Sequence, residues 1–151
     1  MILTPHILIG AAIGAKIGNF YLVALLSLTA HYLMESIPHS EYNINSLKNK
    51  FINKEFYLSL TKVFFDFLLG FSLGFCLSFN SPHFNYVIIG MLFAVIPDFL
   101  LFLYWQYDSK ILSVLRQFHQ ALHFKNKNTL FWQGILTQVI ISLVAILILI
   151  I

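Results

Sequence analysis

The most constraining feature of the sequence is a series of long apolar stretches with few or no charges. Residues 56–79, 84–104 and 130–151 each reach the roughly 20 residues that a helix needs to cross the hydrocarbon core of a bilayer. A further stretch, residues 20–37, is slightly shorter and has no charge before Glu35. We therefore predict a polytopic helical membrane protein.

The composition supports this prediction. Only 10% of the 151 residues are charged, whereas soluble domains usually carry about 25%. So few charges cannot cover a water-facing surface, so most of the outer surface must face membrane lipid. The net charge of +3 is modest and no segment alternates aromatic with basic residues, so we expect no nucleic-acid partner. The length fits one membrane-embedded helical domain over residues 1–151.

The chain begins with a shorter apolar piece, residues 7–17, which is rich in glycine and alanine and could pack closely on a neighbouring helix. Pro5 suits a first helical turn, and Thr4 could cap it. The break at Gly18 and Asn19 predicts a tight hairpin with the next helix. The expected fold class is all-α: a transmembrane bundle of four to five helices, with the first piece either spanning or re-entering.

Basic residues indicate the orientation. They gather in residues 38–55 and 105–128, whereas the turn at 80–83 has neither lysine nor arginine. The positive-inside rule places both basic loops in the cytoplasm, as in a multi-pass protein of a bacterial-type inner (plasma) membrane. Apolar spacing within residues 111–124 predicts one short interfacial helix. The basic residues of the two loops are Lys48, Lys50, Lys54, Lys110, Arg116, Lys125 and Lys127.

Ionisable residues inside apolar segments are costly and usually have a function. Two pairs are spaced four apart, His31 with Glu35 and His119 with His123, so each pair shares a helix face if its helix continues. Asp98 is the only charge in its segment. When each of these ionisable residues is placed along its predicted helix, all of them lie at about the same depth of the membrane, on its cytoplasmic side. The predicted metal ligands are His6, His31, Glu35, His39, Asp98, His119 and His123.

Imidazole and carboxylate are the usual ligands of zinc and related divalent ions. A catalytic ion keeps a position open for water and lowers the pKa of that water, which suits hydrolysis of an ester or phosphoester. We therefore expect a divalent metal, zinc, with Glu35 or Asp98 as general base. Metal-activated water would attack a lipid or lipid-linked phosphoester at the cytoplasmic membrane surface, where headgroups lie.

Two other functions fit the same residues. In a structural or partner-binding membrane protein the polar groups would hydrogen-bond between helices. A metal-ion or proton carrier would need ionisable groups in both membrane halves, and only His83 lies in the outer half. The pattern predicts an ion pair between Lys62 and Asp66, one turn apart. Arg116 fits either a substrate phosphate or a lipid headgroup.

The motifs resemble known metal-dependent hydrolases. The run from His31 to His39 is similar to the His-x-x-x-Asp…Pro-x-His stretch of zinc-dependent phospholipases C, with Glu35 in place of the aspartate. Thr4-Pro5-His6, Pro97-Asp98 and the His119/His123 pair resemble elements of the membrane-bound metal-dependent hydrolase family. The resemblance implies an all-helical site with one or more divalent ions that hydrolyses phosphoesters. The implied ligands are His6, His31, Glu35, Asp98, His119 and His123, with His39 a ligand or a supporting group.

Overall fold

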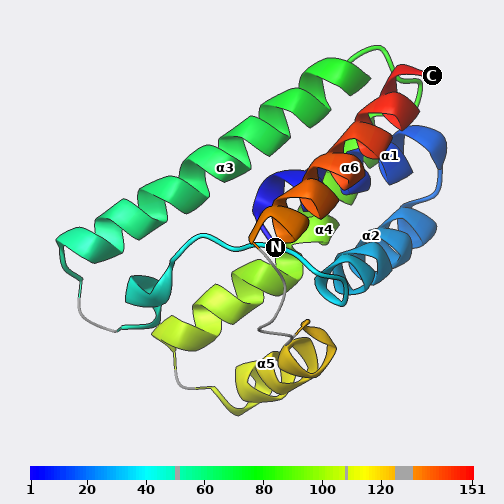
Figure 1. Cartoon of the computed structure of the whole chain (residues 1–151). Helices are drawn as coiled ribbons and strands as arrows, with labels where there is room; N and C mark the ends of the chain where they lie inside the picture. The colour runs from blue at the N-terminus through cyan, green and yellow to red at the C-terminus, as the bar shows by residue number, and fades with distance from the viewer. Residues whose placement is uncertain (50–51, 108, 125–130) are drawn as a thin grey trace.

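The computed structural model describes residues 1–49, 52–107, 109–124 and 131–151 (Figure 1). Within these ranges the chain forms α-helices and one short 3-10 helix, and none of their residues lies in a strand. Lys50, Lys125 and Lys127, used above for the orientation, lie outside the described residues. The elements are α1 (Leu3–Lys16), α2 (Phe20–Glu35), η1 (Asn45–Lys48), α3 (Lys54–Ser78), α4 (Phe84–Gln106), α5 (Lys110–Leu122) and α6 (Phe131–Ile150).

Three helices, α3, α4 and α6, are long and apolar enough to cross a membrane, and α2 is a shorter apolar helix. The 25 residues of α3 extend about 38 Å, whereas the 16 of α2 reach about 24 Å, less than the roughly 30 Å hydrocarbon core. The predicted polytopic all-α bundle is confirmed.

The first helix is the centre of the bundle. α1 contacts α2, α3, α4 and α6, and most of its residues are buried. It begins at Leu3, a turn before the apolar piece at residues 7–17 from which it was predicted. The expected break follows, because α1 ends at Lys16 and the Asn19 side chain caps α2 by accepting from the Leu22 N–H at 3.1 Å.

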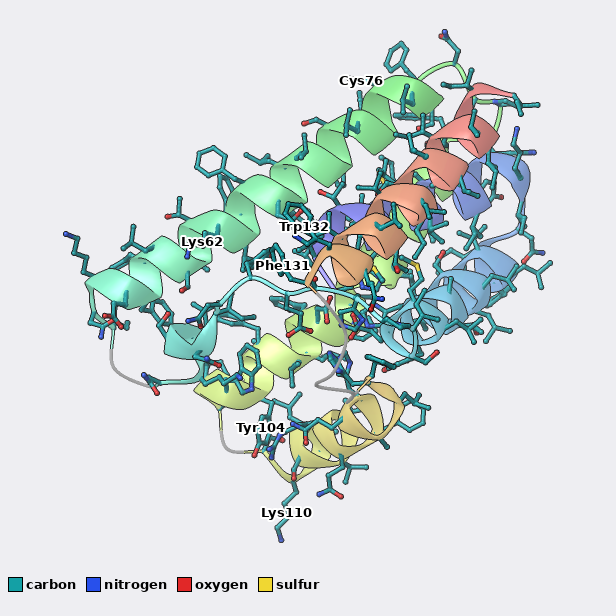
Figure 2. All side chains as sticks on the ribbon, in the orientation of Figure 1. Lys62, Cys76, Tyr104, Lys110, Phe131 and Trp132 are labelled. Atoms are coloured by element: carbon teal, nitrogen blue, oxygen red, sulfur yellow. The ribbon has the colours of Figure 1, made fainter. Side chains whose placement is uncertain are left out.

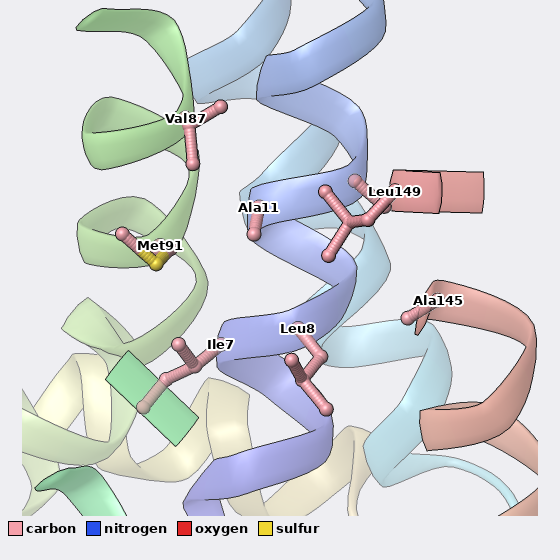
Figure 3. Packing of buried hydrophobic residues seen from close by; sticks show 8 residues of the cluster. Ile7, Leu8, Ala11, Val87, Met91, Ala145 and Leu149 are labelled. Atoms are coloured by element: carbon pink, nitrogen blue, oxygen red, sulfur yellow. The ribbon is translucent and has the colours of Figure 1, made fainter. Parts of the chain in front are cut away.

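Small residues let α1 touch α4 at the backbone, as predicted. A Cβ added at Gly10 would collide with the carbonyl oxygen of Gly90, and one added at Gly14 would collide with that of Tyr86. Any larger residue would force the two helices apart. Beside this contact lies the apolar core shown in Figure 3, which includes Ile7, Leu8, Ala11, Val87, Met91, Ala145 and Leu149.

The start of α1 is capped from another helix. No side chain of α1 itself caps the helix, so the prediction that Thr4 does so was wrong. Instead the Asp66 carboxylate of α3 accepts hydrogen bonds from the backbone N–H groups of Leu3 and Thr4, from the Thr4 hydroxyl at 2.6 Å and from the Tyr42 hydroxyl at 3.2 Å. Among the described residues no ion pair joins Lys62 to Asp66, so that prediction was also wrong. A carboxylate suits this position because a helix N-terminus presents free N–H groups and positive potential.

The predicted interfacial helix is α5. It lies across the ends of α2 and α4 (Figure 1), and apolar side chains such as Ile111 and Val114 are exposed along one face. Figure 2 shows Lys110 projecting away from the bundle at the start of α5. At the other end, the Phe124 N–H donates to the Glu35 carbonyl oxygen at 2.8 Å. The C-terminal end of α5 is thereby fixed against the C-terminal end of α2.

Candidate metal centre

Metal-ligating side chains from several parts of the chain meet at the C-terminal end of α2. They form two groups, and in each group every residue offers a ligand atom within 4.8 Å of all the others. The first group comes from α1, α2 and α4, and the second from α2, the segment after it and the end of α5. The first group is His6, His31 and Asp98, and the second is Glu35, His39, Glu41 and His123.

The first group is built around the side chain of His31. Its ring stacks on that of His6 with centroids 4.3 Å apart, and its Nε2 lies 3.8 Å from Asp98 Oδ1. Nε2 of His119 lies 4.0 Å from the same oxygen, which places His119 at the edge of the group. On its other side, His31 Nδ1 donates to the Ala94 carbonyl oxygen at 2.8 Å. That bond fixes the tautomer in which Nε2 carries a free lone pair toward Asp98.

In the second group, as for His31 in the first, each imidazole faces a backbone carbonyl with Nδ1 and a carboxylate with Nε2. Nε2 of His123 lies 2.9 Å from Glu35 Oε2 and 2.8 Å from Glu41 Oε1, while Nε2 of His39 lies 3.3 Å from Glu41 Oε1. The Nδ1 atoms of His39 and His123 face the carbonyl oxygens of Ile37 and Phe124 at 2.9 and 3.0 Å. Each ring thus donates from Nδ1 to the backbone and turns Nε2 toward the carboxylates.

The segment that carries His39 and Glu41 is held in place by α6. The Ser40 hydroxyl donates to the Phe131 carbonyl oxygen at 2.8 Å, and the Gln138 amide donates to the Ser40 carbonyl oxygen at 3.0 Å. A Cβ at Gly134 would collide with Ser40, so glycine there allows the segment to cross α6 closely. These contacts position side chains that belong to no helix.

Glu35 lies between the two groups. Its Oε1 is 3.1 Å from His6 Nε2 in the first group and 2.6 Å from the Met1 amino group, while its Oε2 faces His123 in the second group. The side chain is 1% exposed. One buried carboxylate therefore acts on both groups.

Several buried polar atoms of this region lack a hydrogen-bond partner. Among the described residues six such side-chain atoms occur, and only Ser27 Oγ lies outside the two groups and His119. Glu35 Oε2 meets His123 as an ion pair but makes no hydrogen bond. An unpartnered buried polar atom costs about 1–3 kcal/mol, so a cluster of them is suited to hold an ion or ordered water. The other four atoms are His6 Nδ1, His31 Nε2, Asp98 Oδ2 and His119 Nδ1.

Protons stabilise the second group in this structure. The Glu35 carboxylate beside it and the hydrogen bond with Glu41 raise the pKa of His123 to about 10, so its imidazole is charged at neutral pH. The bonds from His123 and His39 hold the pKa of Glu41 below its ordinary value. By contrast, burial lowers the pKa of His119, which is therefore neutral and can act as a ligand.

All seven predicted ligands lie in this one region, although His119 stands outside the two tight groups. Sequence reasoning missed Glu41, which is half exposed and sits in a segment without helical periodicity. Its signal was weak but present, because the chain has only six acidic residues and Glu41 follows His39 by two positions.

The fold and this region define a helical membrane bundle whose His and carboxylate groups could hold a metal ion. No protein-family model matches the chain, and neither a curated protein nor a solved structure matches it. The following proposals are therefore built on the geometry of the two groups.

Proposed function

We propose that this protein is a membrane-bound metal-dependent hydrolase that holds two divalent ions, zinc, one in each group. The observation that carries the proposal is the set of buried, unpartnered ligand atoms, led by His31 Nε2 and Asp98 Oδ2, that converge beside Glu35. Purely structural histidines and carboxylates would be expected to satisfy one another. A cation in the first group would satisfy these atoms instead, and a cation in the second group would replace the protons that join its imidazoles to Glu35 and Glu41.

The ring orientations favour a metal over a proton network. His31, His39 and His123 each donate from Nδ1 to a backbone carbonyl and turn Nε2 into a group. Metal-ligating histidines usually have such an outer hydrogen bond, which fixes the tautomer and the ring plane. Mixed nitrogen and oxygen donors suit zinc, and the family resemblance of the sequence motifs points the same way.

A divalent ion in such a site lowers the pKa of water toward neutrality and polarises a phosphoryl oxygen. The chain would supply the general base. Both oxygens of Glu35 face cationic or imidazole groups, whereas Asp98 Oδ2 has no partner. We therefore assign Asp98 Oδ2 as the proton acceptor, and Glu35 as the carboxylate that joins the two groups.

The proposed substrate is a lipid or lipid-linked phosphoester at the cytoplasmic surface of the inner membrane. Lys48, Lys54 and Lys110 lie at the ends of η1, α3 and α5, in the basic loops that the positive-inside rule assigns to the cytoplasm. The candidate centre lies where α2 and α5 meet at that same end of the bundle. Lipid headgroups would therefore be within reach.

Metal content measured by mass spectrometry on detergent-purified protein tests the proposal, with His31→Ala and His123→Ala as variants and His83→Ala as control. His83 lies in the turn before α4, away from both groups. We expect about two zinc ions per chain in the wild type and the control, and a loss in each site variant. The rate of phosphoester hydrolysis should fall together with the zinc content in the two site variants.

Two results would redirect the function. A folded wild-type chain that takes up no offered zinc, manganese or cobalt would refute the hydrolase and favour a structural or partner-binding role. Metal binding without hydrolysis, together with metal or proton flux in liposomes, would favour the carrier.

A further inference from the structure

A large cavity lies between α3 and α4 and reaches the candidate metal centre. Its volume is about 1560 Å³, and Glu35, Asp98, His119 and His123 line it. Pockets for small ligands usually have volumes of about 300–1,000 Å³, so this space admits something larger. The residues at its other end come from η1, which contacts both α3 and α4 (Figure 1).

The walls of the cavity are two apolar stripes at helical spacing. Leu60, Phe64 and Phe67 form the stripe on α3, and Leu92, Val95 and Phe99 form the stripe on α4. We measure along each helix axis from the end near η1, which is Lys54 in α3 and Gln106 in α4. In both helices the stripe then begins about 9–11 Å from that end and finishes about 20–21 Å from it. Because the two helices run antiparallel through the short turn that joins them, the stripes stand at the same depth.

The cavity is open to the hydrocarbon region. Phe64 and Phe99 remain 55% and 57% exposed although they lie inside candidate membrane spans. An apolar hollow that opens to the bilayer at this depth takes up hydrocarbon in preference to water. Each stripe extends about 10 Å, which fits within the roughly 15 Å of one leaflet.

The cavity is also lined by a cation, the guanidinium of Arg116, whose position is fixed by a neighbouring side chain. Arg116 stands one turn before His119 on α5. Its guanidinium donates to the Tyr104 hydroxyl at 2.9 Å and lies 4.7 Å from the centre of that ring; Figure 2 labels Tyr104. A guanidinium has five N–H donors, so most of them can still bind the oxygens of a phosphate.

We propose that this groove, defined by the six stripe residues, binds the hydrocarbon chain of a membrane lipid with a phosphoester headgroup. The lipid enters sideways from the bilayer, its chain lies between α3 and α4, and its phosphate lies between Arg116 and the side chains of Asp98 and His119. The proposal rests on the proposed function only for the reaction that follows binding.

Photo-crosslinking tests this without requiring hydrolysis. The probe is phosphatidic acid with a diazirine in its acyl chain, in phosphatidylcholine liposomes that contain the whole protein. We expect crosslinks on Phe64 and Phe99 to exceed those on the about equally exposed Leu136 and Ile140 of α6 by about tenfold, or about 1.4 kcal/mol. Diacylglycerol with the same diazirine lacks the phosphate and should lose this excess. Even labelling of all exposed helices, or equal labelling by diacylglycerol, would overturn the proposal.

A matched pair of variants separates the groove from the rest of the lipid-facing surface. Leu60→Trp fills the groove and should remove most of the excess, whereas Leu69→Trp places the same residue on an exposed face of α3 that does not line it. Excess labelling in a chain that neither binds metal nor hydrolyses phosphoesters would keep the lipid site and refute the hydrolase. Hydrolysis of a water-soluble phosphoester, together with even labelling of all exposed helices, would keep the hydrolase and refute the lipid site.

Discussion

Glu35→Gln should weaken both metal groups, whereas Glu41→Gln should weaken only one. The two substitutions are chemically identical, because each replaces a carboxylate by a neutral amide of nearly the same shape. Glu41 contacts His39 and His123 of the second group, but Glu35 also lies 3.1 Å from His6 of the first. The pair therefore tests whether one carboxylate serves both groups.

The size of the effect follows from the two roles of Glu35. In the second group it is a candidate ligand, and in the first it orients His6 from outside. Loss of an orienting partner typically weakens metal binding about 10- to 100-fold. At free zinc about tenfold above the wild-type Kd, a group is about 90% occupied, and this weakening lowers its occupancy to between about 50% and 10%. Loss of a direct ligand at the second group should cost at least as much.

Zinc per chain is measured by mass spectrometry after dialysis against a zinc buffer. We expect about two ions in the wild type, about one in Glu41→Gln, and about half an ion or less in Glu35→Gln. Circular dichroism and thermal melting check that both variants are folded. If Glu35→Gln keeps one full ion as Glu41→Gln does, the two groups do not share Glu35.

Three further predictions concern stability and protons. Asp66→Ala should lower the unfolding free energy by about 2–4 kcal/mol in detergent, since it leaves the N–H groups of Leu3 and Thr4 and the Tyr42 hydroxyl without their acceptor, and should leave metal content unchanged. Gly10→Val should lower the melting temperature, because the added Cβ collides with the Gly90 carbonyl oxygen. At a helix position with free space the same substitution would raise helix propensity and stability. Since the pKa of His123 is raised to about 10, zinc must displace its proton, so calorimetry in two buffers at pH 7 should show about one proton released, and affinity should rise with pH. A pH-independent affinity would contradict that reading.

The three candidate membrane-spanning helices could be predicted from the sequence, because hydropathy alone is enough to recognise them. Stretches of α3, α4 and α6 are apolar over the length of a bilayer, and no tertiary contact is needed to recognise them. The start of α1 could not be predicted in this way. Its capping group is Asp66, 62 residues distant from Thr4 along the chain, and local patterns favoured an ion pair with Lys62.

For the candidate site, helical spacing predicted the pairs within one element but not their grouping. His31 and Glu35 lie one turn apart on α2, yet His31 joins the group of Asp98 while Glu35 faces both groups. Which group a side chain enters depends on how α1 and α5 dock onto α2. Glu41 was missed for a related reason, because contacts with α6 rather than local structure bring it to the site.

The charge of the site gives an independent reason to expect metal and an anionic substrate together. Oxygens of Glu35 and Glu41 lie within 4.8 Å of each other, a repulsion of about 3.5 kcal/mol at an effective dielectric constant of 20. Without ions, the protonated His123 and the Met1 amino group offset this repulsion, and Arg116 balances the charge of Asp98. Two divalent ions would bring four positive charges to three carboxylates, so the loaded site would attract the anion that the apolar groove and Arg116 are placed to receive.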